Sequence, residues 1–380
     1  MPAIDKVLIK VASRCNINCN YCYVYNLGDD GWRSMPKQIS IDTMQTIVNS
    51  LSEFSKIQKK PFTIILHGGE PLLLGAPKLD LFLATLRTAF SHEYPIGIQT
   101  NGILIDNEIL DICSKHHTTI AVSLDGPKDI NDRFRVDNDG NGTYEKVISG
   151  IQKLSKHPDG KFLFSGVLAV IDPQSDPFIV YKFFKDLQVP SVDLIHPDGN
   201  HTKLPPGKSE YHSTEYGEWL SRFFDVYLSD PTPSEICLLD NMIKCLLREK
   251  MDRGGWIKED YEILVIDTDG TFTKNDILKS TGNRSDRFKE GLSVKNSSIQ
   301  DLISSNEFLD YHKEQLPSAP LCLSCPELAM CGGGIPAHRW KEQTGFNNES
   351  IYCQDQKLLC KKIRKSLDSF CINTPCTPNI

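Results

Sequence analysis

The feature that most constrains the fold is a regular alternation of short apolar runs with longer amphipathic segments through the first half of the chain. The first two apolar runs are Val7-Leu-Ile-Lys-Val-Ala12 and Phe62-Thr-Ile-Ile-Leu-His67. Further runs are expected at 95–100, 118–124, 161–170 and 191–196. Strands that alternate with helices predict right-handed βαβ units and a parallel sheet.

Six such strands within about 190 residues predict an α/β fold, a partial, TIM-like (β/α)6 barrel that is open on one side. The intervening segments repeat apolar residues at helical spacing, and Ser40 is the expected N-cap of the first helix. The expected helices are 40–58, 77–90, 106–116, 143–156 and 176–187. In such barrels the chemistry gathers at the C-terminal ends of the strands, so motifs that directly follow strands are the candidates for function.

The second half of the chain has a different pattern. Helices are expected at 214–229 and 234–251, and Tyr261–Ile266 and Thr271–Lys274 read as a β-hairpin around Asp-Thr-Asp-Gly. Residues 317–353 are rich in Cys, Gly and Pro, which is typical of a small metal-stapled domain.

We therefore predict three parts. They are a core barrel over 1–200, a helical linker region over 201–258 and an α+β, cysteine-rich domain over 259–380. The first predicted strand begins near residue 6, so we expect no separate peptide-binding domain before it.

Cysteine content and charge narrow the class of protein. The chain has 13 cysteines, mainly in two groups, and clustered cysteines in a reducing compartment indicate metal ligands or catalytic thiols. A net charge of −7 offers no basic patch for nucleic acid. The sequence shows neither a signal peptide nor an apolar run of membrane-spanning length. We expect a cytoplasmic protein that binds neither nucleic acid nor membrane.

The first cysteine group directly follows the first predicted strand. Cys15, Cys19 and Cys22 are separated by three and then two residues. Three such thiolates can each bind one iron of a cube and leave the fourth iron open to a small molecule, although zinc also binds cysteines. The second predicted strand ends in Gly68-Gly-Glu-Pro71, whose glycines permit close approach of a ligand. Alone this second motif is weak, because Glu70 can equally be a helix-capping acid.

Together the two motifs resemble those of the radical S-adenosylmethionine (SAM) enzymes. The resemblance implies a [4Fe-4S] cluster on Cys15, Cys19 and Cys22, whose fourth iron is chelated by SAM. Reductive cleavage of SAM in this family gives a 5′-deoxyadenosyl radical that abstracts a substrate hydrogen. The cofactor then carries the difficult chemistry, and the protein supplies position and shielding.

The same resemblance implies a set of SAM contacts. Gly68, Gly69 and Glu70 would meet the methionine amino group, and Tyr21 would lie against the adenine. Four further positions end the third and fourth strands, with the last two facing the ribose: Gln99, Asn101, Ser123 and Asp125.

Arg135 would pair with the SAM carboxylate, as a planar cation can. Asn131 stands where related enzymes often have His, which is a departure from the pattern. Taken singly, each of these positions is equally well an ordinary turn or surface residue.

The second cysteine group resembles the SPASM domain of many radical SAM peptide-modifying enzymes. Its four cysteines are Cys322, Cys325, Cys331 and Cys353. Four thiolates fully ligate a cube, and a structural zinc is the alternative.

SPASM domains usually hold two auxiliary clusters, but this chain has Asn275 and Ile335 where ligands of the first auxiliary cluster are expected. We therefore predict a single auxiliary [4Fe-4S] cluster on the four cysteines. Three cysteines are left over, Cys360, Cys371 and Cys376, and we expect Cys360, on a basic helix, to be a spare thiol rather than a ligand.

Two features suggest the reaction. Asp276 follows Asn275, and in sulfatase-maturating relatives an Asp in this place takes the substrate proton; the alternative is a turn or surface aspartate. The tail Gly332-Gly-Gly followed by His338-Arg-Trp340 resembles that of SPASM maturases that form cyclophane crosslinks. For His338, a structural role with satisfied hydrogen bonds is favoured slightly over a catalytic one.

The resemblance implies an enzyme that modifies a ribosomally made precursor peptide by β-hydrogen abstraction and carbon–carbon crosslinking to an aromatic side chain. Its other partner would be an electron donor such as flavodoxin or ferredoxin. Thioether formation and formylglycine formation, as in sulfatase maturation, are the alternatives within the enzyme class. A binding protein stapled by zinc or iron–sulfur is the alternative outside it, and anaerobic metal analysis with a test for 5′-deoxyadenosine discriminates the two classes.

Overall fold

The computed structural model describes residues 2–251 and 261–373. Their contacts divide them into two compact units. The first comprises the described residues of Met1–Val170, Val189–Ser191 and Glu259–Gln315, and the second those of Ile171–Gln188, Val192–Lys258 and Leu316–Ile380. The division into 1–200, 201–258 and 259–380 stays a prediction, and its boundary at 258 lies outside the described residues.

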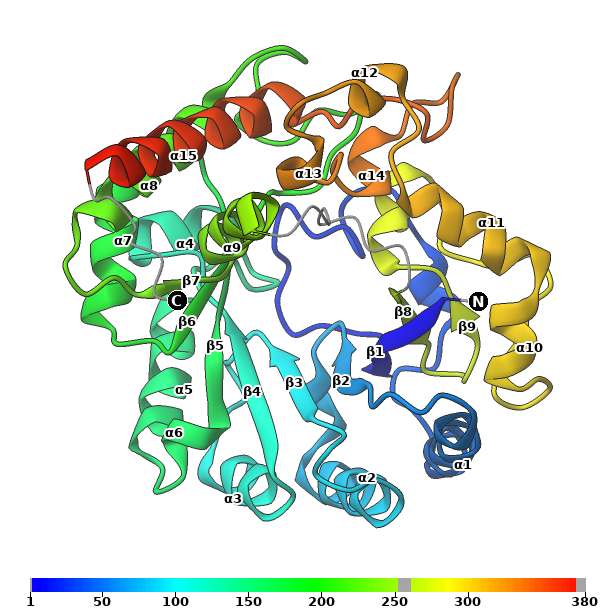
Figure 1. Cartoon of the computed structure of the whole chain (residues 1–380). Coiled ribbons are helices and arrows are strands. Elements are labelled where there is room, and N and C mark those ends of the chain that lie inside the picture. The colour runs from blue at the N-terminus through cyan, green and yellow to red at the C-terminus, as the bar shows by residue number, and fades with distance from the viewer. Residues whose placement is uncertain (1, 252–260, 374–380) are drawn as a thin grey trace, which may run out of the picture. The chain divides into compact units, whose positions relative to one another are not determined.

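Five parallel strands form the body of the first unit (Figure 1). They are β1 (Ala3–Ala12), β2 (Thr63–Gly68), β3 (Ile96–Thr100), β4 (Thr118–Ser123) and β5 (Phe164–Val170). Each strand pairs in parallel with the next along the chain, so their C-terminal ends share one edge. The predicted α/β fold with an open, mostly parallel sheet is confirmed.

The predicted hairpin also belongs to this sheet. β8 (Tyr261–Ile266) pairs in parallel with β1, and β9 (Phe272–Thr273) pairs antiparallel with β8. Val7 lies opposite Leu264. The register therefore brings the residues that follow β8 to the C-terminal end of β1.

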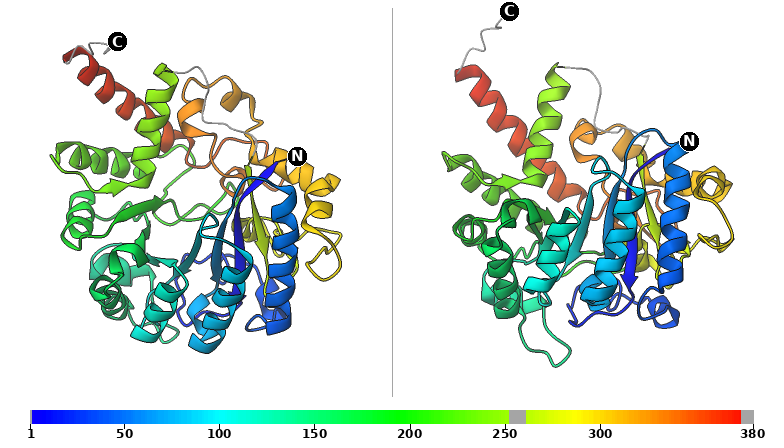
Figure 2. Two further views of the ribbon diagram at one scale, coloured as in Figure 1. Left: turned by 60° about the horizontal axis from the view of Figure 1, so that its bottom comes forward. Right: turned by 90° about the horizontal axis from the view of Figure 1, so that it is seen from below.

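Amphipathic helices cover the outside of the sheet. α1 (Ile41–Ile57) contacts α2 (Ala76–Ala89), which contacts α3 (Asn107–Lys115), and Figure 2 shows these blue and cyan helices along one side of the strands. Ser40 caps α1 as predicted, because its hydroxyl accepts a hydrogen bond from the Thr43 amide.

The remaining helical segments of the first unit are shorter or lie later in the chain. They are α4 (Lys128–Phe134), α5 (Tyr144–Lys156), α6 (Gly160–Leu163), α10 (Ile299–Ser304), α11 (Asn306–Gln315) and the 3-10 turns η1 (Gly31–Ser34), η2 (Pro71–Leu74) and η3 (Asp276–Thr281). The strand predicted from residue 161 begins at Phe164, since α6 occupies the preceding residues.

The second unit is largely helical. Its elements are α7 (Pro177–Asp186), β6 (Ser191–Ile195, in this unit from Val192), α8 (Glu215–Ser229), β7 (Glu235–Ile236), α9 (Cys237–Met251), α12 (Pro320–Leu323), α13 (Leu328–Cys331), α14 (Pro336–Arg339) and α15 (Cys353–Asn373). α15 packs against α8 and α13. Among the described residues, no helix combines the length and the hydropathy that crossing a membrane requires.

Candidate functional site

The three cysteines of the first group lie together in the loop after β1. Burial, with smaller contributions from the neighbouring thiols of Cys19 and Cys22, raises the pKa of Cys15 to about 12. Burial and the Cys19 thiol likewise raise the pKa of Cys22 to about 11. Cys19 is buried and Cys15 and Cys22 are half-buried. Three thiols within electrostatic reach of one another fit an iron–sulfur cube, whose positive irons would replace the thiol protons.

Side chains of the barrel fasten this cysteine loop. The Tyr21 hydroxyl donates a 2.7 Å hydrogen bond to Asp125 and accepts a 2.9 Å hydrogen bond from Arg135. The Asn26 amide donates to the Cys19 carbonyl over 2.8 Å. Three of the predicted SAM-binding residues, Tyr21, Asp125 and Arg135, are therefore in one hydrogen-bonded chain.

Arg135 has a second, unused donor. The residue is 5% exposed, and its Nε has no hydrogen-bond partner among the described residues. A buried guanidinium with an unpaired N–H suits an anionic group, because a charge-assisted bond would satisfy that donor. The SAM carboxylate that the sequence predicts at Arg135 fits this donor.

The two glycines after β2 are required by the chain itself. Gly68 has φ 141°, and a Cβ there would lie 2.1 Å from the Ala12 carbonyl oxygen. A Cβ at Gly69 would lie 2.1 Å from the Tyr25 hydroxyl, and the Gly69 amide donates to the Ala12 carbonyl over 2.8 Å. The glycines thus let the ends of β1 and β2 approach each other.

Glu70 is completely buried, and both carboxylate oxygens accept hydrogen bonds. Oε1 accepts from the Leu72 amide and the Thr100 hydroxyl, and Oε2 accepts from the Asn101 amide over 2.8 Å. Glu70 therefore caps the turn after β2, which was the alternative interpretation, and it also ties the end of β2 to the end of β3.

The other predicted SAM-binding residues lie at the same edge. Gln99 donates a 3.0 Å hydrogen bond to the Ser123 hydroxyl. The Asn101 side chain donates to Asn16 over 2.7 Å, with the Cys15 sulfur 3.8 Å away. The ends of β3 and β4 thus meet the cysteine loop, as the strand-end argument predicts.

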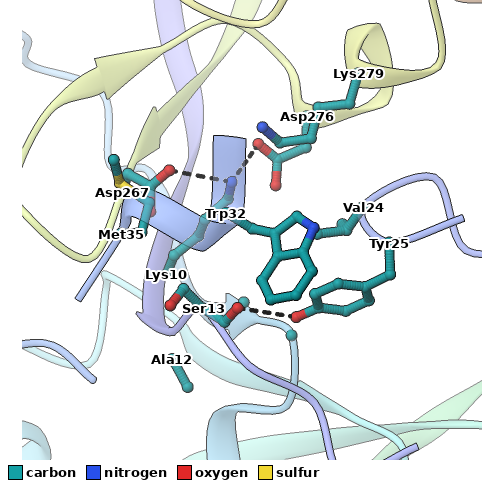
Figure 3. Close-up of a pocket in the computed structure, with 12 residues that line it drawn as sticks. Lys10, Ala12, Ser13, Val24, Tyr25, Trp32, Met35, Asp267, Asp276 and Lys279 are labelled. Atoms are coloured by element: carbon teal, nitrogen blue, oxygen red, sulfur yellow. Dashed lines mark hydrogen bonds and ion pairs between the residues drawn. The ribbon is translucent and has the colours of Figure 1, made fainter. Parts of the chain in front are cut away.

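Asp276 lies in a pocket at this edge (Figure 3). It is 2% exposed, and its Oδ1 lies 2.7 Å from the Lys10 ammonium, whereas Oδ2 has no hydrogen-bond partner among the described residues. Lys10 also lies 3.5 Å from Asp267. Gly68 and Gly69 line the same pocket.

The sequence analysis did not single out Trp32 and Tyr25, which form the aromatic side of this pocket, or Lys10, which reaches it from β1. It also did not single out His67, which does not line the pocket but interacts electrostatically with Asp276. Burial lowers the pKa of His67, and its Nδ1 has no hydrogen-bond partner among the described residues. A lysine within an otherwise apolar strand is the one signal that pointed here, because a buried charge requires a partner.

The four cysteines of the second group also lie together. Burial, with smaller contributions from the thiols of Cys353, Cys322 and Cys325, raises the pKa of Cys331 to about 12. Cys360 is completely buried, and the Cys331 and Cys325 thiols contribute to the rise of its pKa. The group therefore has a fifth thiol beside it.

No group of three or more His, Cys, Asp or Glu side chains in the described part of the chain is arranged around a single metal ion. A cube takes one iron for each thiolate instead. The side chain of Cys371 and all of Cys376 lie outside the described residues.

The glycines and the histidine of the tail motif have structural roles. Gly332, Gly333 and Gly334 have φ of 65°, 76° and 73°, a conformation that favours glycine at each position. His338 is 6% exposed, with its Nε2 3.4 Å from Asp198 and its ring 4.9 Å from that of Tyr352.

Asn275, in place of an expected cysteine, caps η3 by accepting a hydrogen bond from the Ile277 amide. The predicted absence of the first auxiliary cluster stays a prediction.

Comparison with known proteins identifies a family that the N-terminal part of the chain resembles. Residues 9–171 match the Radical SAM superfamily. This part of the chain is therefore similar to the radical SAM superfamily in sequence. The superfamily uses a [4Fe-4S] cluster and SAM, in agreement with the cysteine loop and the strand-end residues described above.

Similarity extends beyond this domain. The cysteine-type anaerobic sulfatase-maturating enzyme of Clostridium novyi is 23% identical over 95% of this chain and 96% of that enzyme. Native anSMEcpe with bound AdoMet has a TM-score of 0.81 at 22% identity, over 97% of this chain and 99% of that chain. SuiB of Streptococcus suis bound to its precursor peptide SuiA has a TM-score of 0.65 at 15% identity, over 93% of this chain and 76% of that chain. At these identities the structural likeness shows a shared fold.

Proposed function

We propose that the protein is a radical SAM enzyme that removes two hydrogens from a ribosomally made precursor peptide. The observation that carries this proposal is the pocket in which Asp276 lies beside Gly68 and Gly69. A buried carboxylate with an unpaired oxygen, next to the turn proposed to bind SAM, is placed to accept a proton from a substrate.

Each of the two cysteine groups is assigned one cluster. Cys15, Cys19 and Cys22 would hold the cluster that binds SAM, and the second cysteine group, Cys322, Cys325, Cys331 and Cys353, would hold one auxiliary cluster. When bound, these groups would supply the 5′-deoxyadenosyl radical and an acceptor for the electron that the substrate loses. Arg135 would bind the SAM carboxylate through its free Nε, and Tyr21 and Asp125 would keep that guanidinium in place.

The favoured product is a cyclophane. A β-carbon of the peptide would lose a hydrogen atom and bond to an aromatic ring carbon, and the ring would then lose one electron and one proton. Asp276 would take that proton at Oδ2. The Gly-Gly-Gly and His-Arg-Trp tail supports this product.

Formylglycine formation is the second candidate. Similarity to the anaerobic sulfatase-maturating enzyme of Clostridium novyi over 95% of this chain favours it. Asn275 in place of an auxiliary-cluster cysteine argues against it. Thioether formation would also remove two hydrogens.

The test begins with anaerobically reconstituted protein. We expect about eight irons per chain and release of 5′-deoxyadenosine with SAM and dithionite; little iron with bound zinc would instead indicate a binding protein. Co-expression with a short open reading frame next to the gene should give a peptide that is lighter by two hydrogens. Fragmentation that places a link between an aromatic residue and a β-carbon would support the cyclophane. A product that reacts with an aldehyde-specific hydrazide would instead contain formylglycine and would overturn the cyclophane proposal.

A further inference from the structure

Two consecutive residues of α15 interact with thiols of the second cysteine group. The Cys331 thiol donates a 2.9 Å hydrogen bond to the amide oxygen of Gln356. Lys357 follows Cys353 by one helical turn on α15 and interacts electrostatically with its thiol. Cys353, Gln356 and Lys357 all belong to α15, so the helix that provides one cysteine also provides polar neighbours for two of them.

A cluster ligand is a thiolate, which has no proton to donate and can only accept hydrogen bonds. Gln356 can donate to such a thiolate if its terminal amide flips, because the flip exchanges the amide oxygen and the NH₂ group at the Cys331 sulfur. Gln356 and Cys331 both line a cavity of about 200 Å³, which leaves space for that rotation. The Lys357 ammonium group can only donate hydrogen bonds, whether the neighbouring cysteine is a thiol or a thiolate.

We propose that Gln356 and Lys357 are positioning residues that hydrogen-bond two ligand sulfurs of the auxiliary cluster and raise its reduction potential. The inference rests on the proposed function, which assigns that cluster to this cysteine group. Hydrogen bonds to ligand sulfurs disperse the negative charge that reduction adds, so they favour the reduced cluster.

A raised potential matches the role that the proposed function gives this cluster. Its reduction takes up the one electron that the substrate loses after the new carbon–carbon bond forms, while the accompanying proton goes to Asp276. Oxidised flavodoxin or ferredoxin would then remove the electron. The two donors differ in character, because Gln356 is neutral, whereas Lys357 carries a charge that salt screens at a half-exposed site.

The experiment uses the full chain with Cys15, Cys19 and Cys22 changed to Ser, so that the auxiliary cluster gives the only iron–sulfur signal. Gln356→Leu and Lys357→Met are each reconstituted anaerobically and titrated with dithionite while the signal is followed by electron paramagnetic resonance. Gln354→Leu and Lys361→Met on the same helix are the matched controls.

We expect both test variants to shift the midpoint potential to a more negative value, with full iron content, and the controls to leave it unchanged. High salt should shrink the shift of Lys357→Met but not that of Gln356→Leu. Lys357→Arg should restore the potential, and Gln356→Glu should shift it further than Leu, which keeps the test open if one variant fails to fold.

Unchanged potentials in Gln356→Leu and Lys357→Met at full iron content would overturn the inference and leave the proposed function standing. A triple serine chain that holds no iron would instead remove the auxiliary cluster from the proposed function, and the inference with it.

Discussion

The ion pair between Lys10 and Asp276 allows a stability prediction that follows directly from its burial. Lys10 is 6% exposed and Asp276 is 2% exposed, with 2.7 Å between their charged atoms. Burial would lower the pKa of Lys10, but Asp276, Asp267 and Asp286 raise it above its ordinary value, so the ammonium stays charged. Lys10→Met therefore leaves the Asp276 carboxylate buried without its counter-charge.

Breaking a buried pair from one side costs about 3–5 kcal/mol, because the remaining charge stays uncompensated. Asp276→Asn should cost less, since Lys10 keeps Asp267 at 3.5 Å. The double variant Lys10→Met/Asp276→Asn removes both charges of this pair, so neither is left buried without a partner. Asp267 still has Arg287 at 3.2 Å. It should therefore be more stable than Lys10→Met alone, with a coupling of roughly 0.5–3 kcal/mol.

The assay is urea unfolding of anaerobically purified protein, followed by tryptophan fluorescence, since Trp32 lines the same pocket. With a slope of about 3 kcal/mol per molar urea, the Lys10→Met midpoint should fall by about 1 M. Lys6→Met, at an exposed position of the same strand, is the control and should stay at the wild-type midpoint. A Lys10→Met midpoint equal to the wild type, or a double variant below Lys10→Met, would refute the reasoning.

Four further outcomes are expected. Asp276→Asn should lower peptide product at least about 100-fold while 5′-deoxyadenosine release continues, as measured by mass spectrometry; unchanged product would remove Asp276 from the mechanism. Cys15→Ser and Cys322→Ser should each lose about four irons, and only Cys15→Ser should abolish 5′-deoxyadenosine release. Arg135→Gln should weaken SAM binding about 10-fold or more by calorimetry, because it removes a charge-assisted bond to the carboxylate. His196 is partly exposed, but its Nε2 is enclosed, and burial lowers its pKa to about 3. The unfolded chain therefore takes up a proton below about pH 6.5, so about 2 kcal/mol of stability should be lost between pH 7 and pH 5 in the wild type and retained in His196→Gln; equal urea midpoint shifts in both would contradict this.

The sequence predicted what depends on local periodicity and on strand ends. The alternating strands, the Ser40 cap and the hairpin of β8 and β9 all appear in the structure. The meeting of Gln99 and Asn101 with their neighbours at one sheet edge follows from the parallel strands.

Pairings between distant segments were not predictable from such patterns. Nothing local indicates that β8 pairs with β1, and this pairing alone brings Asp267 and Asp276 to Lys10. The role of Glu70 was likewise only half visible, since one of its hydrogen bonds is to its own turn and the other two are to the end of β3.

The hydrogen bonds that hold the cysteine loop affect how the protein should respond to oxygen. Tyr21, from within the cysteine motif, is tied to Asp125 and Arg135, and Asn26 is tied to the Cys19 carbonyl, by bonds that need no iron. We therefore expect the loop to keep its shape if oxygen removes the proposed cluster, so that only the cluster is lost and the fold is retained. The proposed cluster should then be restored by adding iron and sulfide to the folded protein, without unfolding or new synthesis of the chain.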